Sequence, residues 1–110
     1  MEIDIHVEAK GVVAAIRGRL DTVSAQAFEK DLAGALNREE KLLVLDLSGL
    51  EYISSAGLRV ILSAAKTLKA SGGDIRLAAA QGSVKKVLQI SGFFTLFKGF
   101  DTKDAALAAV

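Results

Sequence analysis

The sequence predicts an α/β domain in which crossover helices cover an open, mixed and mostly parallel sheet, in the order β-β-α-β-α-β-α-β-α. Two observations support this fold. Short apolar runs alternate with segments of helical periodicity, and the N-terminal run alternates apolar and polar residues instead. With 110 residues, 51% of them apolar and 25% charged, the chain has the size and balance of one packed domain spanning residues 1–110.

The first two strands are expected to pair as an antiparallel hairpin. Ile3, Ile5 and Val7 alternate with polar neighbours, which is typical of a strand with one solvent-facing side. Residues 12–17 follow directly after Lys10-Gly11 and supply the second strand. The sheet therefore begins with an antiparallel pair.

The remaining strands are expected to be parallel. Residues 42–45 and 75–78 are brief continuous apolar runs between helical segments, as in strands that helices cover on both faces. A last short strand is expected over residues 96–100, where the aromatic content is equally compatible with a packed loop. In such sheets function usually lies beyond the carboxyl ends of the strands, so the end of the strand over 42–47 is the first place to examine.

Helical periodicity marks the connections between these strands. Apolar residues recur at spacings of three or four within 25–36, and more strongly within 58–68. The polar residues 37–41 separate the first of these helices from the next strand. A third helix is expected over 84–91, opened by Ser83, and a fourth over 105–110, with Thr102 and Asp104 placed to cap it.

Composition excludes several classes of function. Fourteen basic and thirteen acidic residues leave a net charge of +1 and are spread along the chain, so direct nucleic-acid binding is not expected. Cysteine is absent, which rules out disulfides and thiolate metal sites. The N-terminus lacks the pattern of a signal peptide, and no apolar run approaches the roughly 20 residues that span a bilayer. We expect a cytoplasmic protein without membrane insertion.

Catalytic and cofactor motifs are also missing. No Gly-x-Ser-x-Gly occurs, and the single histidine, His6, falls on the polar side of the first strand. The glycines do not form a phosphate-binding loop, and the acidic residues show no metal-ligand spacing. We therefore predict no enzymatic activity, no cofactor and no metal site.

The segment after the third strand carries the most specific pattern. Ser54 and Ser55 stand directly before the residues where helical periodicity begins. The first N–H groups of a helix are unpaired and its dipole is positive there, so a phosphate on this turn would be stabilised by about 0.3 to 2 kcal/mol. From the residues alone, helix capping by either serine is the commoner use of such a position.

A family resemblance extends over the chain. Residues 43–48, LVLDLS, and 52–62, YISSAGLRVIL, resemble the STAS domain, in particular the bacterial anti-sigma factor antagonists. Residues 16–21, IRGRLD, are similar to that family's turn between strand and helix, and 90–97, ISGFFTLF, to its closing segment. The resemblance implies one STAS domain over residues 1–110.

The resemblance also implies particular site residues. The phosphorylated serine of these antagonists stands two residues before a Gly-Leu pair, which places the acceptor at Ser55. Ser54 occupies a position often held by aspartate and is the alternative acceptor. The implied partner-docking residues are Asp21, Ser54, Ala56, Gly57, Leu58 and Arg59. Asp21 is equally compatible with a cap on the first helix.

The implied function is a phosphorylation-gated switch. The unmodified chain would hold an anti-sigma factor serine kinase of the histidine-kinase-like ATPase fold and so free a sigma factor for transcription. Phosphorylation would end the binding, and a serine phosphatase would restore it. Two alternatives use the same fold: an accessory subunit of an ATP-driven lipid or solute transporter, and a scaffold subunit of a stress-sensing assembly.

Two side-chain clusters leave alternatives open. The aromatic cluster favours a core position over a ligand pocket, with a homodimer patch as an alternative; its members are Phe93, Phe94, Phe97 and Phe100. A set of basic residues is compatible with a solvated helix face or with the rim of a docking surface; its members are Arg59, Lys66, Lys69, Lys85 and Lys86.

Overall fold

The computed structural model describes residues 1–36 and 41–109. Its elements are β1 (Glu2–Glu8), β2 (Gly11–Leu20), α1 (Ser24–Leu36), β3 (Leu42–Ile53), α2 (Ser55–Ala70), β4 (Asp74–Ala78), α3 (Gly82–Ile90), α4 (Phe93–Leu96), β5 (Gly99–Phe100) and α5 (Lys103–Ala108). The predicted loop after α1 falls largely on residues 37–40, and the predicted last helix ends at residue 110; these positions lie outside the described residues.

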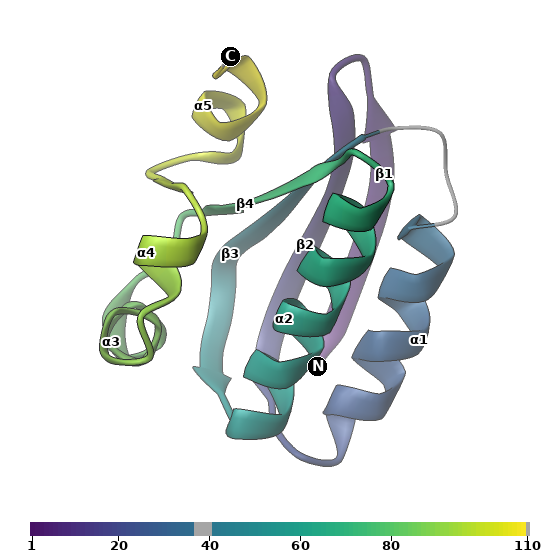
Figure 1. Ribbon diagram of the computed structural model, residues 1–110. Coiled ribbons are helices and arrows are strands. Elements are labelled where there is room, and N and C mark those ends of the chain that lie inside the picture. The colour runs from purple at the N-terminus through teal and green to yellow at the C-terminus, as the bar shows by residue number, and fades with distance from the viewer. Residues whose placement is uncertain (37–40, 110) are drawn as a thin grey trace.

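The five strands form one sheet in the order β1-β2-β3-β4-β5. β1 pairs with β2 antiparallel, and the other neighbours are parallel, which confirms the predicted mixed sheet. Figure 1 shows α1 and α2 lying across the sheet, with α3 and α4 beside them and α5 at the opposite end from the starts of α1 and α2. The fold is thus a single α/β domain with crossover helices.

The main core lies between the sheet and the helices α1 to α4. Phe28 and Leu32 of α1 and Ile61 of α2 are almost completely buried, as their spacing predicted. Each such side chain contributes about 1.5 to 3 kcal/mol by leaving water. A smaller core on the other side of the sheet joins Ala106 and Leu107 of α5 to strand residues.

β3 is longer than the predicted strand. Its first half, through Asp46, pairs with β4, and its second half continues with β2 alone until Ile53 lies opposite Leu20. Two register shifts in this pairing each give β3 an extra residue, as in β-bulges. Leu47, Leu50 and Ile53 therefore face the core at a spacing of three. The regular alternation of apolar and polar residues that would predict a strand is missing from this half of β3.

The C-terminal region also differs from its prediction. Residues 93–96 form a helical turn, α4, and the strand expected over 96–100 is confined to Gly99–Phe100. Gly92, at φ 76°, reverses the chain after α3. Phe93 and Phe97 are buried with their ring centroids 5.5 Å apart, so packing of these rings favours the turn over a longer strand. Phe94 and Phe100 are only partly buried.

The helix starts match the expected capping in part. Thr102 caps α5 by accepting a hydrogen bond from the backbone N–H of Ala105. Ser83 does not cap α3, which begins one residue earlier; its hydroxyl lies 3.3 Å from the carbonyl oxygen of Glu51 instead. Within residues 1–36 and 41–109, none of the helices combines the length and the apolar character that crossing a bilayer requires.

Candidate functional site

The starts of α1 and α2 lie next to each other at one end of the molecule. The pairing of β2 with β3 sets Leu20 opposite Ile53, and the backbone N–H of Ser54 donates to the carbonyl oxygen of Leu20 at 2.8 Å. Asp21 and Ser54, which follow these two strand ends, are brought together although 33 residues apart in sequence. Figure 1 shows both helices beginning at the lower end of the sheet.

The start of α1 is closed by reciprocal hydrogen bonds. The backbone N–H of Ser24 donates to Oδ1 of Asp21, and the N–H of Asp21 donates to Oγ of Ser24, both at 2.9 Å. These bonds from Ser24, backbone first and then side chain, lower the pKa of Asp21. Asp21 therefore acts as a helix cap; its predicted docking role stays a prediction.

The two serines at the start of α2 have different environments. Ser54 is the N-cap, and its Oγ accepts a hydrogen bond from the backbone N–H of Gly57 at 3.2 Å. Ser54 is half-buried, whereas Ser55, the first residue of α2, is exposed. Among the described residues, the Ser55 hydroxyl has no hydrogen-bond partner. Capping thus falls to Ser54 and leaves the Ser55 hydroxyl accessible.

The residues after Ser55 divide into inward-facing and outward-facing positions. Gly57 is buried, and a Cβ added there would lie only 2.8 Å from Cγ of Leu20, so its lack of a side chain lets α2 approach β2. Ala56 and Leu58 are half-buried against the main core. Arg59 is exposed. Of the six predicted docking residues, Arg59 is the exposed one and offers its side chain to a partner.

A shallow groove between α1 and α2 adjoins this end of the molecule. Arg59 lines it together with Thr22, Gln26 and Glu29. These three residues on and before α1 were not predicted as site residues, because periodicity identified only the buried face of that helix. Their contribution depends on the tertiary packing of α1 against α2.

Two further exposed side chains lie at the same end of the sheet. Val23 is 87% exposed in the turn before α1, and Tyr52 is 38% exposed near the end of β3. The guanidinium carbon of Arg19 lies 4.3 Å from the centre of the Tyr52 ring, a cation–π contact. An apolar residue within the otherwise polar turn Asp21-Thr22-Val23-Ser24 was the sequence signal for Val23.

This arrangement lacks the parts of a serine nucleophile site. His6 lies on β1 opposite Val13, seven residues along β2 from Leu20 and therefore roughly 23 Å from the end that holds Ser55. Its ring Nε2 lies 3.1 Å from Glu8 Oε2. The described residues contain no group of three or more His, Cys, Asp or Glu side chains suited to a metal ion.

Comparison with known proteins agrees with the fold and places the chain in a family. Residues 2–106 match the STAS domain, so the chain belongs to the STAS domain family. It is 39% identical over 98 residues to BtrV of Bordetella bronchiseptica, a candidate anti-sigma factor antagonist, a match that covers 89% of this chain and 84% of that protein.

Two further relatives carry similar names. The chain is 28% identical over 110 residues to the anti-sigma F factor antagonist of Paenibacillus polymyxa, which covers 97% of this chain and 94% of that protein. The crystal structure of an anti-sigma factor antagonist from Mycobacterium paratuberculosis matches with a TM-score of 0.90 at 25% identity, over 99% of this chain and 92% of that one. The family resemblance predicted from the sequence is confirmed.

Proposed function

We propose that this protein is an anti-sigma factor antagonist that binds an anti-sigma factor in its unmodified form and is released by phosphorylation of Ser55. The observation that carries the proposal is that the two serines at the start of α2 have different hydrogen bonding and exposure. Ser54 caps α2, while the Ser55 hydroxyl is exposed and free of hydrogen bonds among the described residues. The names of the relatives support the class of partner.

A phosphate on Ser55 would act on the interface more than on the fold. It would stand at the start of α2, where the helix dipole favours a negative charge by about 0.3 to 2 kcal/mol. An uncompensated charge carried into a docked interface costs roughly 2 to 5 kcal/mol, so the larger effect is loss of binding.

The remaining parts of the switch follow from this class of function. The partner is an anti-sigma factor that is itself a serine kinase of the histidine-kinase-like ATPase fold, and a metal-dependent serine phosphatase reverses the modification. The chain works by binding and not by catalysis, in the cytoplasm, where it regulates transcription by freeing a sigma factor. Asp21, Ser54 and Arg59 belong to the docking surface together with the turn around Ser55.

Phosphate mapping with the cognate kinase tests the acceptor. After incubation with kinase, Mg²⁺ and ATP, mass spectrometry should place one phosphate on Ser55 of the wild type and of Ser54→Ala. Ser55→Ala should stay unmodified. Ser24→Ala is the matched control, because Ser24 also opens a helix at this end of the molecule, and it should be modified like the wild type. Full modification of Ser55→Ala on Ser54 would contradict the assignment.

Pull-down with and without ATP tests the class of function. A phosphorylation-gated antagonist should bind its kinase before turnover and lose it afterwards. Constant association with a transporter ATPase, with no phosphate gained, would instead identify an accessory subunit. Self-association into a large assembly with other STAS proteins would identify a scaffold subunit, and sedimentation of the purified chain would also reveal a homodimer.

A further inference from the structure

The charges of this protein are divided unevenly along the chain. Between Glu51 and Asp101 there is a single acidic residue, Asp74. The same stretch contains seven basic residues: Arg59, Lys66, Lys69, Arg76, Lys85, Lys86 and Lys98. The segment that forms α2, β4, α3 and α4 is therefore basic, and acidic residues elsewhere in the chain bring the net charge to +1.

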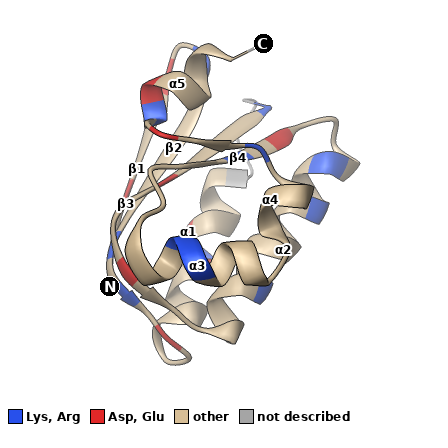
Figure 2. Ribbon diagram, turned by 90° about the vertical axis from the view of Figure 1, so that its left-hand side faces the viewer, with Lys and Arg blue, Asp and Glu red and all other residues tan. Residues whose placement is uncertain are grey.

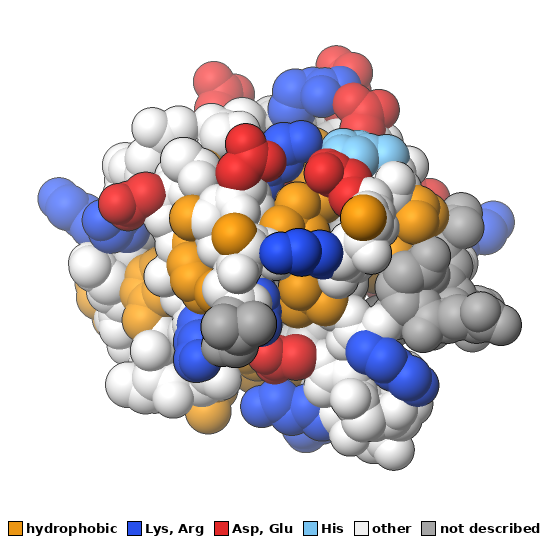
Figure 3. Space-filling view, turned by 90° about the horizontal axis from the view of Figure 1, so that it is seen from above, with side chains coloured by type: hydrophobic (Ala, Val, Ile, Leu, Met, Phe, Trp, Pro, Cys, Tyr) orange, Lys and Arg blue, Asp and Glu red, His pale blue; other side chains and the backbone are white. Residues whose placement is uncertain are grey.

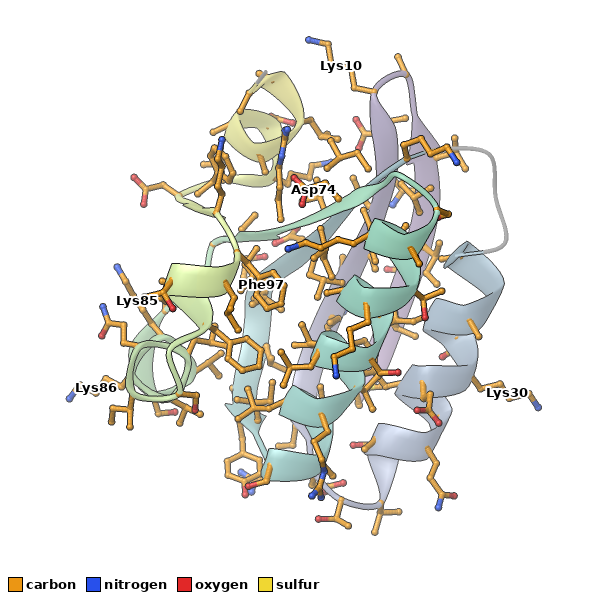
Figure 4. The ribbon with its side chains drawn as sticks, viewed as in Figure 1. Lys10, Lys30, Asp74, Lys85, Lys86 and Phe97 are labelled. Atoms are coloured by element: carbon orange, nitrogen blue, oxygen red, sulfur yellow. The ribbon has the colours of Figure 1, made fainter. Side chains whose placement is uncertain are left out.

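The fold places part of this basic segment around α3 and α4, whereas Arg76 donates to carbonyl oxygens at the end of α5 and Arg59 lines the groove between α1 and α2. Figure 2 shows blue on α3, and neither α3 nor α4 carries a red segment. Figure 4 shows Lys85 and Lys86 pointing from α3 into solvent, on the side opposite Lys30 of α1. Lys69 of α2 belongs to the same side, since its Nζ lies 5.9 Å from the centre of the Phe97 ring.

The opposite end of the molecule has a different charge pattern. Around α5 and the β1–β2 turn, acidic and basic side chains are mixed (Figure 3). Several of them pair with each other, as Lys103 does with Glu8 at 3.3 Å. The lysines of α3 make no salt bridge among the described residues, so their charge is available to a partner.

A groove lies beside these lysines. It has a volume of about 420 Å³ and runs between α3, α4 and β5. Its walls include the partly buried rings of Phe94 and Phe100, Lys85 and Gln89 form its α3 side, and Asp101 lines it after β5. A hollow with aromatic walls fits a protruding apolar side chain, and a lysine at its side favours acidic neighbours around that side chain.

The two helices that border the groove also carry exposed apolar residues. Ile90, one helical turn after Lys86, is 87% exposed, and Leu96 of α4 is 56% exposed. Both lie on the part of the chain that forms α3 and α4. Apolar side chains surrounded by like charges are typical of a docking surface with an apolar centre and a polar rim.

We propose that the groove between α3, α4 and β5 is a second docking surface, and that its partner is an acidic protein segment that inserts an apolar side chain between Phe94 and Phe100. The groove favours a protein segment, because the rings of Phe94 and Phe100 line a hollow that fits one inserted side chain. The outward-facing Ile90 and Leu96 make membrane binding the outcome that the test must separate from it. Lys85 and Asp101 both line the groove, and Lys86 and Lys98 are chain neighbours of the lining residues Lys85 and Gly99. Three lysines against one aspartate favour an acidic partner. This surface does not depend on the phosphorylation of Ser55.

A designed peptide tests the groove directly. The probe is a short synthetic peptide with one central leucine flanked by glutamates, titrated into the isotope-labelled full chain and followed by NMR. Amide signals of Lys85, Gln89, Gly99 and Phe100 should shift, while those at the start of α2 should not. The same peptide with lysines in place of glutamates, or with alanine in place of leucine, should bind much more weakly.

Charge variants give the quantitative test. Lys85→Glu combined with Lys86→Glu should weaken peptide binding about tenfold, and Gln89→Glu about threefold, since exposed charges contribute modestly one by one. Lys30→Glu changes the same type of charge on α1 and should leave the affinity within about twofold. Raising the ionic strength from about 0.1 M to about 1 M, which shortens the Debye length from roughly 10 Å to 3 Å, should weaken the wild type most. These variants replace exposed helix residues, and thermal melts confirm that they fold.

Several results would overturn the proposal. The first is equal peptide affinity for the wild type and the Lys85/Lys86 double variant. The second is equal affinity of the wild type for the lysine peptide and the glutamate peptide. The third is a set of amide shifts confined to the start of α2. Binding to phosphatidylglycerol vesicles without binding to the peptide would assign the surface to a membrane. Because the probe requires neither kinase nor ATP, failure here leaves the Ser55 proposal standing, and failure at Ser55 leaves this one standing.

Discussion

The starts of α1 and α2 lie side by side and both place a serine at the first helical position, yet the two serines serve different purposes. Ser24 is half-buried, and its hydroxyl is engaged with Asp21. Ser55 is exposed, and the neighbouring Ser54 has taken over the capping role. Helix position alone therefore does not mark a modification site; the decisive feature is whether the serine hydroxyl is itself engaged in hydrogen bonds.

The largest expected effect is on partner binding at the α2 start. Ser55→Asp should lower the affinity for the anti-sigma factor by roughly 2 to 5 kcal/mol, about 30-fold to several thousand-fold, because the carboxylate would enter the interface unpaired. Ser55→Ala should bind persistently. Both affinities can be measured by calorimetry, with thermal melts as the control for folding. Equal affinity of the wild type and a folded Ser55→Asp would refute control of docking by charge at this turn.

The next effect concerns how closely α2 approaches the sheet. Gly57→Ala should destabilise the fold, because the new methyl group meets Leu20 and overpacking costs about 1 to 3 kcal/mol, more than the gain in helix propensity of at most about 1 kcal/mol. Gly34→Ala on α1 is the matched control. A Cβ there meets nothing within 4 Å, so that variant should be stabilised by about 0.5 to 1 kcal/mol. Urea unfolding of both variants would show opposite signs.

Alanine at the three serines compares the caps directly. Ser54→Ala and Ser24→Ala should each lose about 1 kcal/mol of stability, since each removes a hydrogen bond at a helix start. Ser55→Ala should change stability by less than about 0.5 kcal/mol, because alanine suits a helix and no cap is lost. Chemical unfolding provides the measurement. A loss at Ser55 as large as that at Ser54 would mean that both hydroxyls support the helix.

The smallest effect is a dependence on pH at the α1 start. The hydrogen bonds from Ser24 lower the pKa of Asp21 in the folded state below its ordinary value of 3.8. The resulting stabilisation is fully present above about that value and is lost as the pH falls through the folded pKa. Wild type should therefore exceed Asp21→Asn in stability at neutral pH, and the difference should shrink in acid. A difference that is constant from neutral pH to below pH 3.8 would argue against this role of the charge.

The family and most of the fold followed from local patterns in the chain. The hairpin and the two long helices were predicted because their apolar residues repeat at the regular spacing of a strand or a helix, and the parallel strands because continuous apolar runs stand between helical segments. The pattern failed where tertiary pairing changes that spacing. The bulged half of β3 buries Leu47, Leu50 and Ile53 three residues apart, and α4 depends on the packing of Phe93 and Phe97.

The candidate site shows the same division. The sequence by itself determined that two serines stand at a helix start, that Gly57 and Leu58 follow, and that the chain lacks cysteine and a catalytic motif, because these features depend only on residue order. Only the tertiary structure decided that Ser54 is the cap, that Ser55 is exposed, and that Val23 and Tyr52 lie at the same end of the sheet. Burial and hydrogen bonding depend on contacts between distant segments, which neighbouring residues do not specify.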